Sequence, residues 1–260
     1  MDLYDFLQWA WQTIFKGGFF MAKIDREEKR RLFQTPFCRD YWKLAAREFT
    51  DWRVLVLAAM LTAMRIAIKS LSIYVGPDLK ITFGFIVNAV ASMIYGPLVA
   101  ILTSAISDTL GAILFPSGTY FFPFIFEEIA GGVIFALFYY RAKLSTTRVM
   151  LGRLAVTVIC NLLLNPTIMI WYYKIVLGKS YRFLTWPRLA KNIALFPIQT
   201  VILVLLFNML LPVTNRMELT YTGSTKLEIT KKNVITLILL TVLSAAVVAA
   251  YYLWVYVPKG

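Results

Sequence analysis

The chain has 260 residues, 59 % of them hydrophobic, and it carries a formal net charge of +13 without a single histidine. Lacking histidine, and with only Cys38 and Cys160 as thiols, the sequence offers no usual metal site, catalytic triad or disulfide framework. Several apolar runs are long enough to cross a hydrocarbon core of ~30 Å. The composition therefore predicts a polytopic membrane protein without metal or cofactor. Its basic residues are interpreted as topology signals rather than as a nucleic-acid surface.

Residues 1–53 are predicted to form an amphipathic and charged cytoplasmic segment. Within 1–20, apolar residues recur at helical spacing, which is typical of a helix lying in the membrane interface. Residues 21–53 contain the charged run "DREEKRR" and further basic residues. This composition fits either a solvated helix face or a docking surface.

From residue 54 onward we predict an all-α integral membrane protein with seven apolar spans: 54–73, 81–95, 98–115, 121–140, 149–176, 189–213 and 234–257. The pair Gly96-Pro97 should separate the second span from the third, because these residues interrupt helices. The six spans within 54–213 are expected to form one bundle. A polar linker, 214–233, then leads to one additional transmembrane helix.

The basic loops indicate an orientation for this bundle. The N-terminal segment, the linker after the fourth span and the linker after the sixth lie on one side, and all three are basic, so this side should be cytoplasmic. Arg141, Lys143, Arg148 and Arg153 are assigned to the second of these regions. The C-terminus would then be external. The loop between the fifth and sixth spans is basic, although this orientation makes it external. Either its charge is outweighed as a topology signal by the rest of the chain, or the loop attracts an anionic solute.

Charged residues inside the predicted spans are the first candidates for a binding site. Arg65 and Lys69 lie in the first span, Asp108 in the third, and Glu127 and Glu128 in the fourth. A charge at mid-membrane is costly and marks a functional site by default, although Lys69 could extend to the interface. Adjacent glutamates on a helix point about 100° apart. One could therefore pair with Arg65 while the other faces a cavity or a neighbouring helix.

Other patterns add candidate contacts. Ala59, Ala63 and Ala67 recur every four residues and would leave a groove for another helix. An aromatic run follows the third span, and these side chains could form an interfacial belt or stack on a flat ring. Polar residues of the fifth and sixth spans would point into the outer half of the bundle. The aromatic and polar candidates are Tyr120, Phe121, Phe122, Asn161, Asn165, Trp171, Lys191 and Gln199.

Taken together, these segments resemble a known family. The first span with its alanine face, "YGPLVA" at 95–100, "SDTLGAILFPSGTYFFPF" at 107–124 and "PRLAKNIALFPIQ" at 187–199 occur in the order seen in folate-type substrate-binding (S) components of energy-coupling factor vitamin transporters. The resemblance covers roughly residues 54–213. It implies a six-helix bundle that binds folate or a related vitamin from outside.

The resemblance also implies roles for particular residues and partners. The implied pocket includes Arg65, Asp108, Tyr120, Phe121, Phe122, Asn165, Arg188 and Gln199. The alanine face would dock on a transmembrane coupling subunit that works with two ATPase subunits. The chain has no P-loop pattern of its own, so ATP hydrolysis would occur on those partners, and this subunit would not be an enzyme.

Two alternatives remain open at the level of sequence. The chain could be an S component for another vitamin, such as cobalamin or pantothenate. It could instead be an integral-membrane enzyme or an adaptor that uses Asp108, Glu127 and Glu128.

Overall fold

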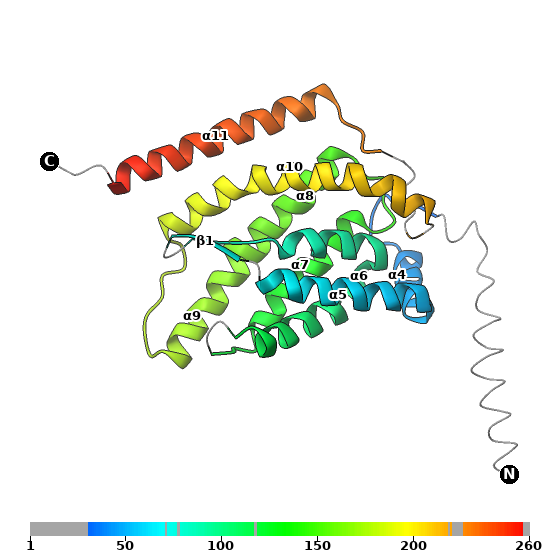
Figure 1. Cartoon of the computed structure of the whole chain (residues 1–260), viewed down its shortest axis with the longest axis horizontal. Helices are drawn as coiled ribbons and strands as arrows, with labels where there is room; N and C mark the ends of the chain where they lie inside the picture. Colours follow the sequence, from blue (N-terminus) through cyan, green and yellow to red (C-terminus); the bar gives the residue numbers. More distant parts are fainter. Residues whose placement is uncertain are drawn as a thin grey trace, which may run out of the picture.

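The computed structural model describes residues 31–70, 72–76, 79–116, 119–217, 219 and 226–256. The amphipathic helix expected within 1–20 lies outside these residues. The elements, in chain order, are α4 (Arg39–Arg47), η2 (Glu48–Thr50), α5 (Trp52–Ser70), β1 (Ser72–Gly76), β2 (Leu79–Thr82), α6 (Gly84–Leu114), α7 (Phe124–Tyr139), α8 (Thr146–Val156), η3 (Thr157–Leu164), α9 (Asn165–Val176), α10 (Trp186–Arg216) and α11 (Lys231–Tyr256). Figure 1 shows the helices lying roughly side by side as an elongated bundle.

The predicted helical membrane fold is confirmed. Within the described residues, three helical stretches are long and apolar enough to cross a membrane, namely α6, the continuous run 146–176 and α10. One detail of the first span was wrong, because the helix ends at Ser70 and a short antiparallel hairpin follows. The β-branched residues at 73, 75, 81 and 82 favour strand over helix here.

The predicted break between the second and third spans lies within α6. Gly96 has φ +72° and ψ −178°, a conformation that side chains disfavour, and Pro97 follows without an N–H to donate. A Cβ added to Gly96 would lie 3.0 Å from the Tyr140 ring. The break therefore also lets the end of α7 pack closely against the turn.

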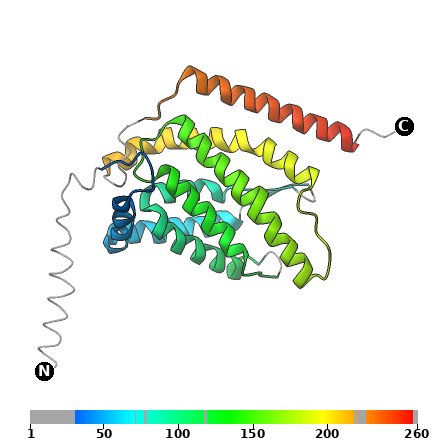
Figure 2. The ribbon, with the colours of Figure 1, turned by 180° about the vertical axis from the view of Figure 1, so that it is seen from behind.

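The predicted fifth span is one helical run that crosses the back of the bundle (Figure 2), and it changes character at its centre. Residues 157–164 are π-helical, and the Asn165 N–H donates to the Cys160 carbonyl, five residues earlier. Pro166 comes next and has no N–H, so it cannot close a normal helical turn. The π-helical turns adapt the helix to this proline.

The main core lies between α6, α7, α8 and α10. Tyr139 and Phe135 stack with ring centroids 5.4 Å apart, and the edge of Phe207 meets Tyr139 at 5.1 Å. The Tyr139 hydroxyl donates to the Val149 carbonyl over 3.0 Å. Gly152 permits this contact, because a Cβ there would come within 2.7 Å of the Tyr139 ring.

Helix α4 packs across the end of the bundle at which α5 begins (Figure 1). Its apolar face buries Tyr41, Leu44 and Ala45, which recur at helical spacing. The Tyr41 hydroxyl donates to the Ala136 carbonyl of α7 over 3.1 Å. Residues 21–53 were predicted to present either a solvated helix face or a docking surface. Within this segment, α4 has one face packed on the bundle of the same chain.

Polar contacts around Arg141 hold the same segment in place. The Phe33 N–H donates to the Arg141 carbonyl over 2.8 Å, and the Arg141 guanidinium lies 3.2 Å from the Glu48 carboxylate. Burial alone would lower the pKa of Arg141, but the neighbouring Tyr140 and Glu48 outweigh it and raise that pKa. Residues 33–48 are consequently clamped to the turn after α7.

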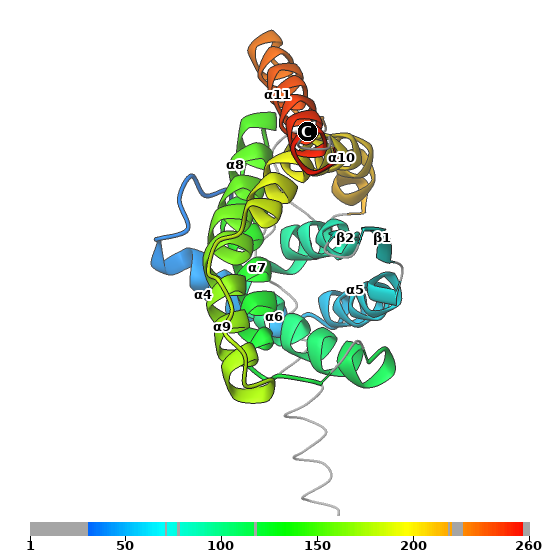
Figure 3. The same ribbon diagram turned by 90° about the vertical axis from the view of Figure 1, so that its left-hand side faces the viewer.

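The last helix, α11, packs along α10 and extends outward from the bundle, as Figure 3 shows in end view. The chain just before it is fastened to the start of α8. Glu228 forms an ion pair with Lys143 at 2.6 Å, and its carbonyl accepts from the Thr146 hydroxyl at 3.0 Å. Leu227 is buried in the main core. The added helix is thereby tied to the bundle just before its first residue.

Candidate functional site

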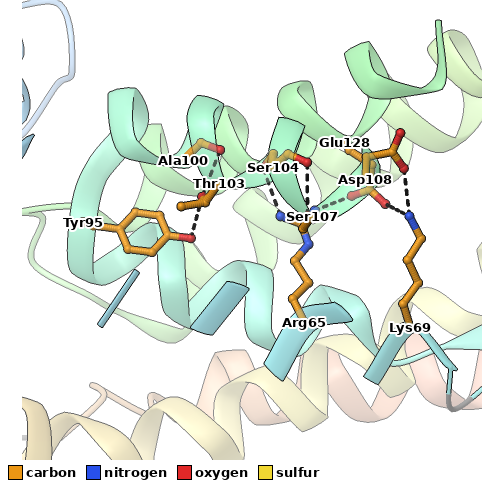
Figure 4. Close-up of polar contacts among 9 residues, drawn as sticks. All are labelled: Arg65, Lys69, Tyr95, Ala100, Thr103, Ser104, Ser107, Asp108 and Glu128. Atoms are coloured by element: carbon orange, nitrogen blue, oxygen red, sulfur yellow. Dashed lines mark hydrogen bonds and ion pairs between the residues drawn. The ribbon is translucent and has the colours of Figure 1, made fainter. Parts of the chain in front are cut away.

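Arg65 is buried within the bundle and is fully engaged there. It projects from α5, its Nη1 donates to the Ser104 hydroxyl over 3.0 Å, and its Nη2 forms an ion pair with Glu128 (Figure 4). Its exposed fraction is 6 %. A charge at this depth is tolerated when a counter-charge and hydrogen bonds replace its water. The predicted pairing of Arg65 with one of the two adjacent glutamates is confirmed.

Lys69 lies one turn further along the same helix and extends the pairing. Its Nζ lies 2.8 Å from Asp108 Oδ1 and 3.6 Å from Glu128 Oε1. Figure 4 shows Arg65 and Lys69 rising in parallel from α5 toward these carboxylates. The side chain is therefore directed at α6 and α7.

Glu127 points away from Glu128 and joins a second set of contacts. Its carboxylate accepts from Asn165 Nδ2 over 2.7 Å, and Asn165 Oδ1 accepts from Arg188 Nη1 over 2.8 Å. The Arg188 guanidinium also donates to the Tyr181 hydroxyl. The two glutamates thus connect α5 and α6 on one side with α9 and α10 on the other. We call the connected set the polar cluster: Arg65, Lys69, Asp108, Glu127, Glu128, Asn165 and Arg188.

The aromatic candidates separate into two groups. Phe121 meets Tyr172 of α9 edge to face at 5.6 Å and Phe124 at 6.1 Å, so it belongs to a packed aromatic group near the start of α7. Phe122 is 60 % exposed and contacts Phe126, and Tyr120 is also exposed. These last two side chains face outward, as residues of an interfacial belt do.

Of the remaining amide candidates, Asn161 is close to the polar cluster. Its Nδ2 donates to Asn192 Oδ1 over 2.9 Å, and Asn192 in turn donates to the Arg188 carbonyl over 2.9 Å. Trp171 is exposed, and Lys191 is half-buried.

Gln199 makes its contact with a helix that carries none of the polar cluster. Gln199 accepts a hydrogen bond from Arg153 of α8, and it lies eleven residues beyond Arg188, about 16 Å along α10 at 1.5 Å per residue. Arg153 was assigned to a basic linker, but it is 4 % exposed inside α8, with its guanidinium 5.2 Å from the centre of the Phe85 ring. The apolar residues that flank Arg153 in the sequence were the signal for this burial.

Two small or polar residues that the sequence analysis did not single out complete the surroundings of Arg65. Ser104 accepts the Arg65 hydrogen bond. Gly132 of α7 lies close to Ser104. A Cβ added to Gly132 would be 2.6 Å from the Ser104 hydroxyl and 3.4 Å from Asn88 Oδ1. Such residues carry no charge or motif that distinguishes them in a single sequence.

Ala59, Ala63 and Ala67 are all exposed on α5. Their face of the helix is thus separate from the one that carries Arg65 into the bundle, and the small side chains leave the α5 backbone open to close approach.

Comparison with known proteins identifies the family. The family model for the substrate-specific component of ECF transporters matches residues 53–207, so the chain belongs to that family. Folate transporter FolT of Clostridium novyi is 37 % identical over 58 % of this chain and 84 % of its own length. FolT of Leuconostoc mesenteroides is 33 % identical over 61 % of this chain and 86 % of its own.

A solved structure is similar as well. The crystal structure of FolT bound with folic acid superposes with a TM-score of 0.52 at 32 % identity, covering 58 % of this chain and 89 % of that one. Family membership makes the chain a membrane-embedded, substrate-binding transport subunit and not an enzyme. Helices α4 and α11 lie outside the matched residues.

Proposed function

We propose that this chain captures folate, or a close relative of it, from outside the cell for import by an energy-coupling factor transporter. The observation that carries the proposal is the polar cluster, in which four of the residues implied by the resemblance (Arg65, Asp108, Asn165 and Arg188) are joined by their contacts with Lys69, Glu127 and Glu128. The FolT relatives and the folic-acid complex support folate as the ligand.

Both signs of charge in the cluster suit such a ligand. Folate presents an aminopyrimidine edge with N–H donors at one end and carboxylates at the other. Glu127 or Glu128 can accept from the donor edge, whereas Arg65 or Arg188 can pair with a carboxylate in a bidentate manner. Arg65 and Lys69 are paired with Glu128 and Asp108, whereas Asn165 lies between Glu127 and Arg188 and hydrogen-bonds to both. Within the described residues, the buried Asp108 Oδ2 has no hydrogen-bond partner. A ligand in the cluster therefore meets donors and acceptors of both charges, which favours a ligand that itself carries both donors and acceptors.

Phe121 supplies an apolar surface beside these groups. It packs with Phe124 and with Tyr172, which lies two turns after Asn165 on α9. A flat heteroaromatic ring can stack or meet aromatic edges at such a surface while its polar edge bonds to the cluster.

The exposed alanine face of α5 is proposed to dock on the transmembrane coupling subunit of a module that also holds two ATPases. Small residues every four positions allow a partner helix to approach the backbone closely. The basic linkers support an orientation with the N-terminus and α4 in the cytoplasm and the C-terminus outside. The loop before α10, with its exposed Lys179 and Arg182, would then face outward and attract anionic solutes.

The identity of the ligand can be tested on the full-length protein. Small molecules that co-purify with the detergent-solubilised protein are identified by mass spectrometry, and the best candidate is titrated by calorimetry. Folate in the extract and tight binding of added folate are the expected results. A different vitamin would retain the transport role but refute folate, and no ligand across a panel of vitamins would favour the adaptor alternative.

A further inference from the structure

The outward face of α4 and the residues after it is divided into two zones. Opposite the buried stripe of α4, Arg39, Lys43 and Arg47 recur every four residues and are exposed, so they form one basic stripe. Trp42 and Phe49 are exposed along the neighbouring flank, at 39 % and 38 %. The helix is therefore apolar toward the bundle, basic on the opposite side and aromatic along one edge.

The aromatic edge continues to the point at which α5 enters the membrane. Trp52, the first residue of α5, is 68 % exposed, and the Arg53 guanidinium lies 5.8 Å from its ring centre. Before α4, Phe37 is 91 % exposed. Tryptophan and phenylalanine beside arginine and lysine are the residues that occupy the headgroup region of a bilayer. We call the exposed residues 37, 39, 42, 43, 47, 49, 52 and 53 the α4 platform.

The acidic residues of the same segment offset only part of this positive charge. Asp40 pairs with Arg31 at 2.9 Å and Glu48 with Arg141 at 3.2 Å, and both of these cations lie outside the basic stripe. Asp51 accepts from the Arg53 N–H at 3.0 Å and keeps its own charge, but the platform carries four cations, Arg39, Lys43, Arg47 and Arg53. What the platform presents outward is a basic stripe with aromatic anchors.

We propose that the α4 platform is a binding site for anionic phospholipid headgroups. The basic stripe complements phosphate and glycerol-phosphate charges, and the aromatic edge inserts at the level of the headgroups. Tyr41 and the Glu48–Arg141 pair hold α4 against the bundle. The platform is thereby fixed beside Trp52, the first residue of α5. The site lies outside the matched family region for most of its length and is independent of the ligand carried by the bundle.

Cys38 makes this proposal testable at the site itself. It precedes the first residue of α4 and is exposed, whereas the other thiol, Cys160, is buried. A fluorescent label on Cys38 of the full chain in lipid nanodiscs reports contact with lipids that carry a quencher on the headgroup. We expect phosphatidylglycerol bearing the quencher to quench the label at about tenfold lower mole fraction than quencher-bearing phosphatidylcholine, and this preference to fall as salt is raised.

Matched variants separate a specific site from a general charge effect. The triple variant Arg39→Gln, Lys43→Gln, Arg47→Gln should reduce the preference for phosphatidylglycerol to within about twofold. The control Lys174→Gln, Lys179→Gln, Arg182→Gln removes the same charge from exposed positions in the last turn of α9 and in the loop that follows it. This control should leave the preference unchanged. Retention of the preference in the first variant, or equal loss in both, would overturn the proposal. Unchanged melting temperature and ligand binding in the first variant show that it is folded.

Discussion

The two cations that α5 sends into the bundle have counter-charges on other helices. Arg65 and Lys69 of α5 meet Asp108 of α6 and Glu128 of α7, so the pairs join three helices as well as neutralising one another. Breaking one pair strands a charge in a region of low dielectric, and this costs more than the pair contributes when intact.

Glu128→Gln should therefore lower the free energy of unfolding by about 2 kcal/mol, since Arg65 loses its counter-charge. The double variant Arg65→Ala, Glu128→Gln should cost less than the sum of the two single changes. Thermal melting of the four proteins in one detergent measures this coupling. Strict additivity would show that the pair does not interact energetically.

Two adjacent glycines of α7 provide a second test at single residues. A Cβ on Gly132 would lie 2.6 Å from the Ser104 hydroxyl, whereas a Cβ on Gly131 would have its nearest neighbour at 3.5 Å. Gly132→Ala should thus destabilise the protein by about 1–3 kcal/mol and weaken ligand binding through Ser104 and Arg65. Gly131→Ala serves as the matched control and should melt close to wild type. Equal behaviour of the two variants in a melting and binding assay would contradict this packing.

Among the elements, α6 depends on a glycine that reverses the local backbone. Gly96 combines a positive φ with the Tyr140 ring 3.0 Å from its missing Cβ, while Gly178 has a positive φ of 62° with nothing within 4 Å. Gly178→Ala should consequently show only the conformational cost of about 1 kcal/mol. Gly96→Ala should show that cost plus a clash, and so a clearly larger fall in melting temperature. A Gly96→Ala protein as stable as Gly178→Ala would refute the close approach.

The elements themselves were largely predictable from hydropathy. The break at Gly96-Pro97, the end of α9 at Val176 and, to within three residues at each end, the bounds of α10 followed from apolar runs and their interruptions. The hairpin after Ser70 was missed because its β-branched residues are as apolar as the helix before it. The π-helical stretch at 157–164 was missed as well, because only its position before Pro166 hints at it.

The site was predictable in its charges but not in its partners. Arg65, Asp108 and the two glutamates are conspicuous because few charges occur in the spans, and the divergence of Glu127 from Glu128 follows from helix geometry. Which carboxylate meets which cation depends on how helices distant in the sequence are packed. The pairing of Gln199 with Arg153 is of this kind, since a polar residue at helical spacing does not reveal which neighbour it faces.

For the whole molecule, capture and transport should be separable. Ala63 lies on the exposed face of α5, away from the polar cluster, so Ala63→Trp should abolish vitamin uptake in cells yet leave the affinity of the purified subunit unchanged. Met209→Trp, at a 75 % exposed position of α10, is the control for a bulky residue on another outer face and should support normal uptake. Normal uptake by the Ala63 variant would contradict docking through this face.

The two additions to the family region both fasten to the same end of the bundle. Helix α4 is held by Tyr41 and Arg141, and the chain before α11 is held by Lys143 and Thr146, which follow Arg141 within five residues. The turn after α7 is thus the point at which both added segments meet the part of the chain that matches the family.

The most direct test of the whole account is a calorimetric titration of folate into the full-length solubilised protein, run in parallel with Arg65→Ala and Arg216→Ala. Capture of folate by the polar cluster predicts nanomolar binding by the wild type. It also predicts a loss of more than about tenfold in affinity for the Arg65 variant, which lacks a charged hydrogen bond to the ligand. The variant at Arg216, which is exposed at the last residue of α10, should bind as the wild type does. Absence of folate binding, or equal affinity in all three proteins, would contradict capture of folate by the polar cluster.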